Sequence, residues 1–478
     1  MYPLQKSFRD ILIHGRNMKP EKPDPVPDSH GKVVEFWDKV VHIVREVASE
    51  FDGRWQIRKR VIDSMLLIML IFRLVSSKAR QSYGTTIDAL WDNDWTLRQQ
   101  LPKKESIAPS SFAVARHKLP ESIFKVINER IVTLYGTQIG DSYRWHGHRM
   151  FAVDGSKMHL PRQLSSAGYR VPSATAHYPQ GLVSCLYQLQ ARIPWDFELA
   201  DHEDERKCAL SHLKALKPGD IVVYDRGYFS CGLLFHHYQT GIHAIFRLSS
   251  STYKPIVDFI QGPQTDGLVT LDASEQARQR IRESFPGMEP KPMPIRLIKY
   301  TISGTTYILG TTLLDPRYEV DAFSEAYHAR WGIEELYKVS KQIMAVEEFH
   351  AKTLRGVKQE LYAHFVLITM NRIFANHADN PDSHEPAPDS SVKTSLDETD
   401  SFARVNFKNC ISVFVRNLEA LFLQQTEDIK QTVVSLMNRI RRRRQKVRPD
   451  RSYPRISMKP VGKWRSNKTI IRPLAVAA

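Results

Sequence analysis

Two short apolar segments, each ending at an aspartate, constrain the fold of this chain most. Residues 150–153 (MFAV) precede Asp154, and residues 221–224 (IVVY) precede Asp225. An apolar run of this length is typical of a strand buried on both faces. If the two strands lie side by side and parallel, both aspartates emerge at the carboxyl edge of one sheet, where α/β proteins place their sites. We expect the first strand to end at the Asp154-Gly155 pair.

The elements around these strands occur in a distinctive order. Alternating apolar and polar residues predict strands at 182–189 and 191–199, followed by a helix over 204–216. The second aspartate strand comes next, then a helix over 231–240 and a strand over 244–248. This succession of strands and helices is the order of an RNase H-like core. We therefore expect an α/β fold with an RNase H-like catalytic core.

The charge of the 478-residue chain is concentrated near its C-terminus. Lys and Arg number 68 against 52 Asp and Glu, which gives +16, and residues 439–468 carry +12 of it. Such a tail favours a polyanion, either nucleic acid or an anionic membrane. The longest apolar run, at 65–72, is too short to span a bilayer, and the first residues show no secretion signal. We therefore expect a cytoplasmic protein whose tail contacts DNA phosphates without reading bases. The residues expected to make these contacts include the cluster Arg441, Arg442, Arg443 and Arg444.

The remaining segments predict helical and irregular regions around the core. Residues 250–312 are rich in Thr, Ile and Tyr with interspersed Gly and Pro, which predicts a β-rich insertion. Helical patterns include 111–134 before the core, and 320–346 and 405–440 after the insertion. The expected regions are a flexible arm over 1–30, a helical DNA-binding region over 31–140, a catalytic domain over 141–376, a linker over 377–402, and a helix with the basic tail over 403–478.

Asp154 and Asp225 are candidates for a metal site. Two carboxylates held close together repel each other, and a divalent cation removes that cost. Two such ions about 4 Å apart can activate a water or a 3′-hydroxyl and stabilise the leaving oxygen of a phosphodiester. This chemistry needs a third carboxylate, for which Glu334 is the candidate. The three residues would then bind the metal ions and be catalytic.

The helix predicted over 320–346 carries four polar side chains on one face. Tyr327, Arg330, Glu334 and Lys341 lie at offsets of 0, 3, 7 and 14 residues, within an arc of roughly 60°. Glu334 can complete the metal triad. Arg330 can hold a phosphate through a bidentate fork, and Lys341 can do so as a point charge.

Each signal also has a purely structural interpretation. An Asp-Gly pair after a strand, as at Asp154, is most often a turn. The helix face could be solvated, because Glu334 and Lys338 have the spacing of a surface ion pair. The acidic segment 202–205 (HEDE) could bind metal, but it lies at a predicted helix N-terminus, where acids are favoured, and we interpret it as structural. The two aspartate motifs and the helix motif together favour the catalytic interpretation.

At these residues the chain resembles the DDE transposases of bacterial insertion sequences. The signature Tyr-x2-Arg-x3-Glu-x6-Lys defines the insertion-sequence-four family, and residues 327–341 match it without departure. The segments FAVDGSKMHLP around Asp154 and IVVYDRGYFS around Asp225 are also similar to those of the family. The resemblance covers about 105 to 375.

The resemblance implies a Mg²⁺- or Mn²⁺-dependent enzyme that acts on double-stranded DNA at the bacterial nucleoid. The three carboxylates would bind two ions, and the other three signature residues would hold the DNA end near its scissile phosphate. Tyr307 in the insertion is the candidate for stacking on a flipped base, although a strand aromatic more often packs. The enzyme would bind terminal inverted repeats, cleave the ends and join the 3′-hydroxyls to target DNA. Pairing two ends requires at least a homodimer.

Two other functions remain open. An RNase H-like nuclease or resolvase would use the same carboxylates without joining strands. A domesticated, non-catalytic DNA-binding protein would keep the fold, although the intact carboxylates argue against it. In the N-terminal helices, Arg116, His117 and Lys118 are candidates for reading the element ends, or they form a solvated face.

Overall fold

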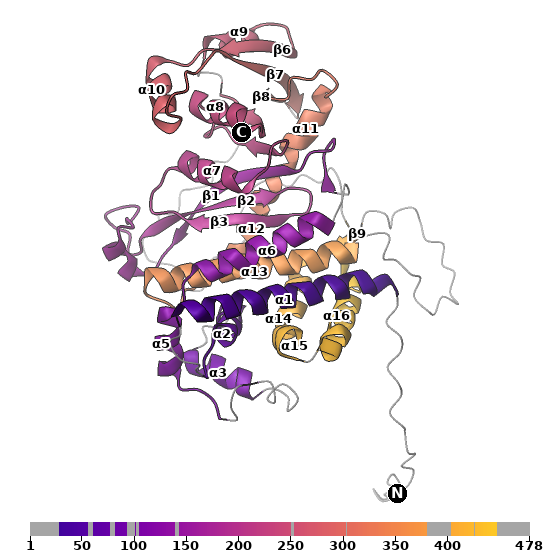
Figure 1. Cartoon of the computed structure of the whole chain (residues 1–478). Coiled ribbons are helices and arrows are strands. Elements are labelled where there is room, and N and C mark those ends of the chain that lie inside the picture. The colour runs from indigo at the N-terminus through magenta and orange to yellow at the C-terminus, as the bar shows by residue number, and fades with distance from the viewer. Residues whose placement is uncertain are drawn as a thin grey trace, which may run out of the picture.

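A mixed sheet of eight strands forms the centre of the protein (Figure 1). The computed structural model describes residues 28–55, 61–76, 82–92, 101, 105–138, 143–249, 253–302, 304–379, 403–424 and 426–446. The strands are arranged in the order β3-β2-β1-β4-β5-β8-β7-β6. Their bounds are β1 (Met150–His159), β2 (Gln180–Gln188), β3 (Ile193–Leu199), β4 (Ile221–Tyr224), β5 (His243–Arg247), β6 (Asp266–Leu271), β7 (Met293–Ile302) and β8 (Thr305–Thr311).

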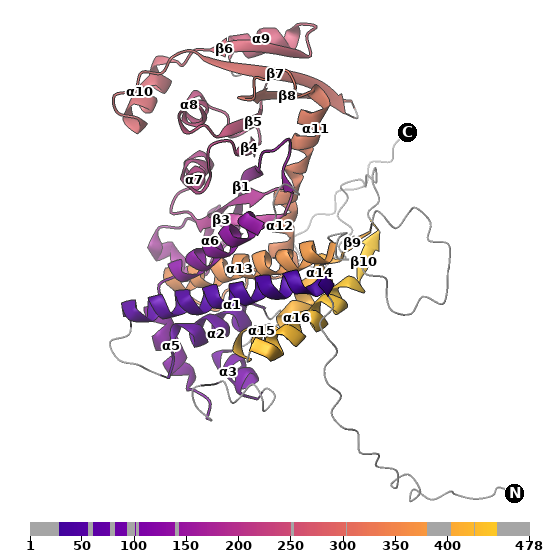
Figure 2. The same cartoon turned by 45° about the vertical axis from the view of Figure 1, so that its right-hand side comes forward.

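The first five strands have the connectivity of an RNase H-like core. Strands β1, β2 and β3 are antiparallel neighbours, β4 pairs parallel with β1, and β5 pairs parallel with β4. Helices α7 (Glu205–His212) and α8 (Cys231–Thr240) connect the parallel strands and lie on one side of the sheet (Figure 2). The fold is therefore mixed α/β with an RNase H-like core, and this prediction is confirmed.

Local sequence explains why these elements begin and end where they do. All four residues of β4 are buried, as expected for a continuous apolar strand. Helix α8 begins after Ser230, whose hydroxyl accepts the N–H of Leu233, and it ends at Gly241 with a left-handed φ of 66°. Helix α7 begins after Asp204, which caps the N–H groups of the first turn.

The β-rich insertion predicted from the sequence extends the central sheet and also contains helices. Its strands do not form a separate sheet, because β8 pairs with β5 and the order continues through β7 to β6. It also contains two helices, α9 (Lys254–Gln261) and α10 (Glu275–Ser284), at the far end of the molecule (Figure 2). The prediction missed them because α10 is highly polar and buries only Ile281.

A layer of helices packs at the β3 end of the sheet (Figure 1). Helix α13 contacts β3, helices α2 and α6 pack on α13, and α1 packs on α2 and α6. Trp37 of α1 is buried against the rings of Phe374, Phe414 and Phe422, with centroid distances of 4.9, 5.8 and 5.3 Å. The N-terminal and C-terminal helices therefore share one core with the sheet domain. The bounds are α1 (Asp28–Trp55), α2 (Ser64–Ser76), α3 (Tyr83–Trp91), α5 (Pro109–Lys118), α6 (Ser122–Gln138), α13 (Leu354–Asp379), α14 (Phe407–Arg416), α15 (Leu418–Leu423) and α16 (Thr426–Arg441).

Three long helices predicted from the sequence are interrupted. The helix over 111–134 divides into α5 and α6 at Leu119-Pro120, since proline disfavours helix at the preceding residue. The helix over 405–440 becomes a short strand and three helices, and the helix over 320–346 divides at Arg330. The bounds of these remaining elements are α11 (Val320–Ala329), α12 (Trp331–Gln342), β9 (Ala403–Val405) and β10 (Arg444–Lys446).

Several predicted segments fall outside the described residues. They are most of the N-terminal arm, the linker from residue 380 to 402, and the tail after residue 446. Among the helices that the structure does describe, none combines the length and apolar character needed to cross a bilayer.

Candidate active site

Asp154 lies inside β1 rather than at the end of a strand. The strand continues to His159, so the prediction that it ends at Asp154-Gly155 is wrong. Parallel pairing with β4 stops at Ala152, and Asp154 lies beyond it. The N–H of Gly155 donates to Asp154 Oδ1 over 2.9 Å. Burial raises the pKa of Asp154 to about 6, although that N–H and the charge of Arg330 act to lower it.

Asp225 follows β4 directly, at the carboxyl edge that the sequence predicts. The Tyr327 hydroxyl donates to Asp225 Oδ1 over 3.0 Å, and Arg247 Nη1 lies 3.8 Å from the same oxygen. Burial alone would raise the pKa of Asp225, but the N–H of Arg226, the Arg330 guanidinium and the Tyr327 hydroxyl together lower it. The carboxylate is therefore held in its charged form.

Glu334 pairs with Arg330 at the junction of α11 and α12. Arg330 Nη2 lies 2.8 Å from Glu334 Oε1, and the two side chains are 6% and 39% exposed. This pair replaces the Glu334–Lys338 surface pair of the structural interpretation, so the helix face is not simply solvated. The Nε of Arg330 is buried and has no hydrogen-bond partner within the described residues.

The Arg330 guanidinium is the common neighbour of the three predicted carboxylates. It bonds to Glu334, and its charge acts on both Asp154 and Asp225. Among the described residues, no three His, Cys, Asp or Glu side chains are close enough to bind one metal ion. The structure therefore gathers the carboxylates around a cationic side chain rather than in the geometry of a metal centre.

The chemistry of this donor set fits a divalent cation. Carboxylate oxygens are the ligands that Mg²⁺ and Mn²⁺ prefer. The one hydrogen bond found for the Asp154 carboxylate within the described ranges comes from Gly155, and Arg330 leaves its Nε unbonded. The Asp154 carboxylate can therefore bind a cation, and Arg330 Nε can donate a hydrogen bond, without the loss of an existing buried hydrogen bond.

Two further residues of α12 attach this helix to β1. The Tyr337 hydroxyl donates to the carbonyl oxygens of Asp154 and Val183, over 2.8 and 3.0 Å. Lys341 Nζ donates to the carbonyl of Lys157 over 2.7 Å. The sequence analysis missed Tyr337, although its position three residues after Glu334 places it on the same helix face.

An aromatic group lies next to Asp225. The rings of Tyr300 and Tyr307 stack with centroids 5.3 Å apart and an interplanar angle of 5°. The Arg247 guanidinium lies 4.8 Å from the Tyr307 ring and 5.8 Å from the Tyr327 ring. Tyr307 is therefore near the predicted site, packed as a cross-strand pair. Arg247 was missed, and its signal is its position at the end of β5, beside β4.

The arginine cluster at the start of the tail divides into two kinds. Arg442 and Arg443 are exposed. Arg444 lies in β10 and bonds to Asp379 and to the carbonyl of Ala403, so its guanidinium is already engaged. Arg441 is partly buried at the end of α16, and burial lowers its pKa. Phosphate contact through this cluster is a better prediction for Arg442 and Arg443.

Arg116 is not available to read DNA. Its guanidinium is buried between α5 and α13, where Nη2 lies 2.6 Å from Glu360 Oε1 and Nε donates to Gln359 over 2.9 Å. The sequence could not distinguish this buried partner from a basic helix end. His117 and Lys118 are exposed.

Ser184, His212 and Asp196 have the hydrogen-bond pattern of a hydrolase triad. His212 Nδ1 lies 2.7 Å from Asp196 Oδ2, and Nε2 lies 3.1 Å from Ser184 Oγ. Ser184 of β2 and His212 at the end of α7 are completely buried. A substrate has no access to the serine, so this network is structural.

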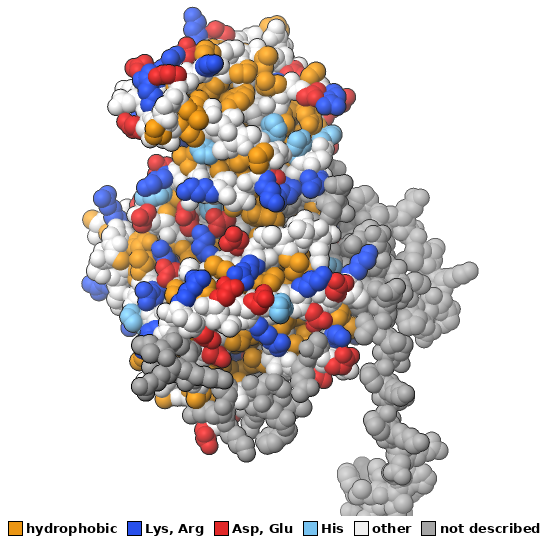
Figure 3. Space-filling model, in the orientation of Figure 1, with side chains coloured by type: hydrophobic (Ala, Val, Ile, Leu, Met, Phe, Trp, Pro, Cys, Tyr) orange, Lys and Arg blue, Asp and Glu red, His pale blue; other side chains and the backbone are white. Residues whose placement is uncertain are grey.

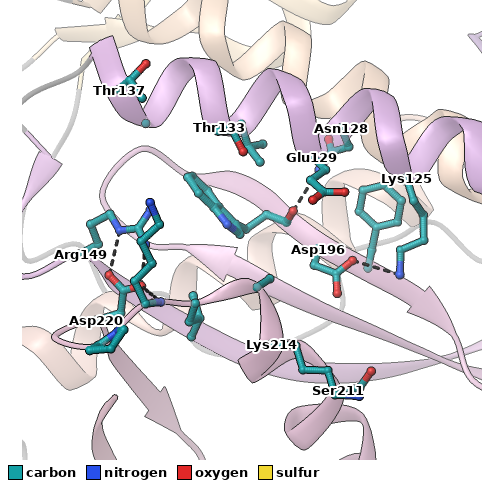
Figure 4. A pocket seen from close by; sticks show the side chains of 18 of the residues that line it. Lys125, Asn128, Glu129, Thr133, Thr137, Arg149, Asp196, Ser211, Lys214 and Asp220 are labelled. Carbon is teal, nitrogen blue, oxygen red and sulfur yellow. Dashed lines mark hydrogen bonds and ion pairs between the residues drawn. The ribbon is translucent and has the colours of Figure 1, made fainter. Parts of the chain in front are cut away.

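A cavity of about 650 Å³ lies at the opposite edge of the sheet (Figure 4). It is lined by α6, β3 and the residues that precede β1 and β4, where Arg149 forms an ion pair with Asp220. Asp154, Asp225 and Glu334 are not among its lining residues. The candidate site therefore lies outside this cavity.

One segment of the chain matches a known protein family. Residues 145–370 match the family model described as "Transposase DDE domain". The chain is also similar to piggyBac transposase in a cryo-EM structure of its synaptic complex with hairpin DNA, at 9% identity, 84% coverage of each chain and a TM-score of 0.41, which is too distant to bear on function. No curated protein matches significantly. The chain thus carries a segment that matches the transposase DDE domain, and this segment contains Asp154, Asp225 and Glu334.

Proposed function

We propose that this protein is a DNA transposase of the insertion-sequence-four type. It would bind the terminal inverted repeats of an insertion sequence, cleave the ends and join the 3′-hydroxyls to target DNA. The observation that carries the proposal is the gathering of Asp154, Asp225 and Glu334 around Arg330 within the segment that matches the DDE domain.

Asp154, Asp225 and Glu334 would hold Mg²⁺ or Mn²⁺, in two ions. When bound, the cations would activate the attacking water or 3′-hydroxyl and stabilise the leaving oxygen. The protein contributes position: Tyr327 orients Asp225 through its hydroxyl, and Tyr337 fixes α12 against β1. These bonds would hold Asp225 and α12 in position for the cations.

Arg330 would exchange its partner when DNA binds. In the free protein its guanidinium neutralises the carboxylates and bonds to Glu334. A DNA phosphate can accept the bidentate fork of an arginine just as a carboxylate can. Transfer of Arg330 to the phosphate would free Glu334 to bind a cation. Lys341, which here bonds to a backbone carbonyl, would hold a second phosphate along the same helix face.

The aromatic group supports a role in holding a displaced base. Tyr307 lies beside Arg247 and Tyr327, close to Asp225. A flipped base could stack here if it displaced Tyr300 from its place beside Tyr307. Because two element ends must be paired, the active complex would contain at least two copies of the chain.

DNA affinity would come largely from outside the sheet domain. On the face drawn in Figure 3, basic and acidic side chains are interspersed over the helical layer. Residues 439–468 carry +12 of the total charge of +16. The tail would therefore supply sequence-independent contacts to phosphates, with Arg442 and Arg443 at its start.

A nuclease without strand transfer and a non-catalytic DNA-binding protein are the competing functions. An assay with two element ends on labelled DNA, the full-length protein and Mg²⁺ separates them, because strand transfer gives joined products, a nuclease gives cuts alone, and a binder gives neither. We expect D154N, D225N and E334Q to abolish cleavage while end binding persists. Glu335 is exposed and adjacent to Glu334, so E335Q is the matched control and should cleave normally. A D154N or E334Q protein that cuts at the wild-type rate would contradict the proposal.

A further inference from the structure

The connection between β1 and β2, residues 160–179, is a largely exposed surface without any acidic side chain. The sequence contains no Asp or Glu between Asp154 and Asp196, whereas Arg162 and Arg170 both lie within the connection. Both arginines are exposed. Neither forms an ion pair with another residue that the structure describes. The β1–β2 connection therefore presents two arginines that have no acidic partner.

Backbone hydrogen bonds and one buried side chain give this connection a defined shape. The N–H of Leu160 donates to the carbonyl of Pro179 over 2.8 Å, which closes the connection at its base. The N–H of Gln180 donates to the carbonyl of Arg170 over 2.9 Å. Leu164, in a short 3₁₀ helix over Arg162–Ala167, is 1% exposed and anchors this part to the core. A partner would therefore meet a surface that is already shaped.

Helix α12 and strand β1 run side by side from the candidate site towards the connection. The Tyr337 hydroxyl donates to the carbonyl of Asp154 over 2.8 Å, and Lys341 Nζ donates to the carbonyl of Lys157 over 2.7 Å. The helix face that carries Glu334 and Lys341 thus follows β1 away from Asp154. The strand ends five residues after Asp154, which is a distance of about 17 Å. DNA held along this helix face would next reach the β1–β2 connection.

The acidic side chains at the base of the connection already have partners. Glu203 pairs with Lys157 over 2.7 Å, and Glu347 Oε1 accepts the N–H of His159 over 2.8 Å. Arg162 and Arg170 therefore remain available for an anion from outside the chain.

Exposed hydroxyl groups accompany the two arginines. Ser165 and Thr175 are exposed, and Tyr178 is 52% exposed. Arginine, serine, threonine and tyrosine side chains are among those that contact the phosphates of DNA. The chemistry of the connection therefore fits the backbone of a DNA duplex.

We propose that the β1–β2 connection is a further DNA-contacting surface, where Arg162 and Arg170 bind backbone phosphates of the DNA end held at the candidate site. The inference rests on the proposed function, because it adds contacts to the substrate of that function. A duplex rises about 3.4 Å per base pair, so about 17 Å along β1 corresponds to about five base pairs. The contacts would lie at about this distance or further from the scissile phosphate, and they would position the DNA without reading its sequence.

The test is the salt dependence of binding by the full-length protein to a labelled DNA duplex of mixed sequence, followed by fluorescence anisotropy. We expect the double variant R162Q/R170Q to reduce the slope of log affinity against log salt by about 1.8, because each lost phosphate contact removes about 0.9. R162K/R170K keeps both charges and should retain most of the slope. Thermal unfolding checks that each variant is folded.

K214Q/K217Q is the matched control, since it removes two exposed lysines that line the cavity at the opposite edge of the sheet. This variant should keep the wild-type slope. An R162Q/R170Q slope equal to that of the wild type would overturn the inference. An equal reduction in K214Q/K217Q would also overturn it, because the effect would then be one of total charge.

A hydroxyl-radical footprint of the element end locates the contacts. R162Q/R170Q should lose protection from about five base pairs onward and keep it next to the cleavage point; the reverse pattern would contradict the inference. Cleavage by D154N separates this question from the proposed function. If D154N is inactive while R162Q/R170Q binds DNA as the wild type does, only the role of the connection is wrong. If D154N cleaves normally while R162Q/R170Q loses slope, the connection contacts DNA and the metal site is wrong.

Discussion

Replacing Arg330 with glutamine should strengthen Mn²⁺ binding by the DNA-free protein. The Arg330 guanidinium lies among the carboxylates that would hold the cation and bonds to Glu334. It therefore competes with a metal ion for the same negative charge. Removing it takes away both a repulsive charge and the partner of Glu334, while the end-binding affinity for DNA should fall because a phosphate contact is lost.

The expected gain in Mn²⁺ affinity follows from the distance between Arg330 and Glu334. A cation bound to Glu334 Oε1 at about 2.1 Å would lie within about 5 Å of Arg330 Nη2, because the N–O distance is 2.8 Å. A unit charge and a divalent charge about 5 Å apart repel by about 1.7 kcal/mol in water. The dielectric constant of water makes this energy a lower bound, because the Arg330 side chain is only 6% exposed. This energy corresponds to roughly 20-fold tighter Mn²⁺ binding.

Titration of Mn²⁺ into full-length R330Q and wild-type protein measures the effect. R330K keeps the charge and should stay close to wild type, and K338Q removes an exposed charge one turn further along α12 and should also change little. Unchanged or weaker Mn²⁺ binding by a folded R330Q protein would refute the idea that Arg330 takes the place of the cation.

Three further predictions concern stability and the tail. E360Q should destabilise the fold by about 3–5 kcal/mol in urea unfolding, because it leaves Arg116 buried and unpaired; a change below 1 kcal/mol would mean that the pair is not buried in solution. D196N should lower stability at neutral pH by about 1–3 kcal/mol. Burial alone would raise the pKa of Asp196, but the hydrogen bond and charge of His212 and those of Lys125 together lower it. Because the pKa of Asp196 is lowered in the folded protein, its contribution to stability is complete above the usual pKa of about 4 and is lost as the pH falls through the lowered pKa. The stabilities of D196N and the wild type should therefore converge in acid. A difference in stability that does not change with pH would contradict this. Deleting residues 447–478 should weaken DNA binding and flatten its salt dependence, while an unchanged slope of affinity against salt would show that the tail does not contact phosphate.

The sequence predicted the core well because its strands carry strong local signals. The apolar run of β4 and the helix expected over 231–240 lie where the patterns indicate. The divided helices were missed because the apolar pattern continues across each break, as it does at Leu119-Pro120. The joining of β8 to β5 depends on strand pairing between distant segments, which periodicity does not report.

The candidate site was predictable as a set of residues but not as an arrangement. Asp225 follows its strand as the sequence predicts, whereas Asp154 lies inside β1. The Arg330–Glu334 bond at the junction of α11 and α12 has no signal beyond its spacing. The close approach of Glu205 to Gly155 has no signal in the sequence, because it exists only in three dimensions. Arg116 was ambiguous for the same reason, since Glu360 lies 244 residues away in sequence.

The central claim is that Asp154, Asp225 and Glu334 share divalent cations when DNA is bound. An anomalous difference map of a crystal of the protein with an uncleaved DNA end and Mn²⁺ measures this directly. We predict peaks at about 2.0–2.3 Å from carboxylate oxygens of all three residues, with Arg330 moved from Glu334 to a phosphate. A fully ordered complex with no Mn²⁺ peak at these residues, and with the carboxylates still gathered around Arg330, would contradict the account.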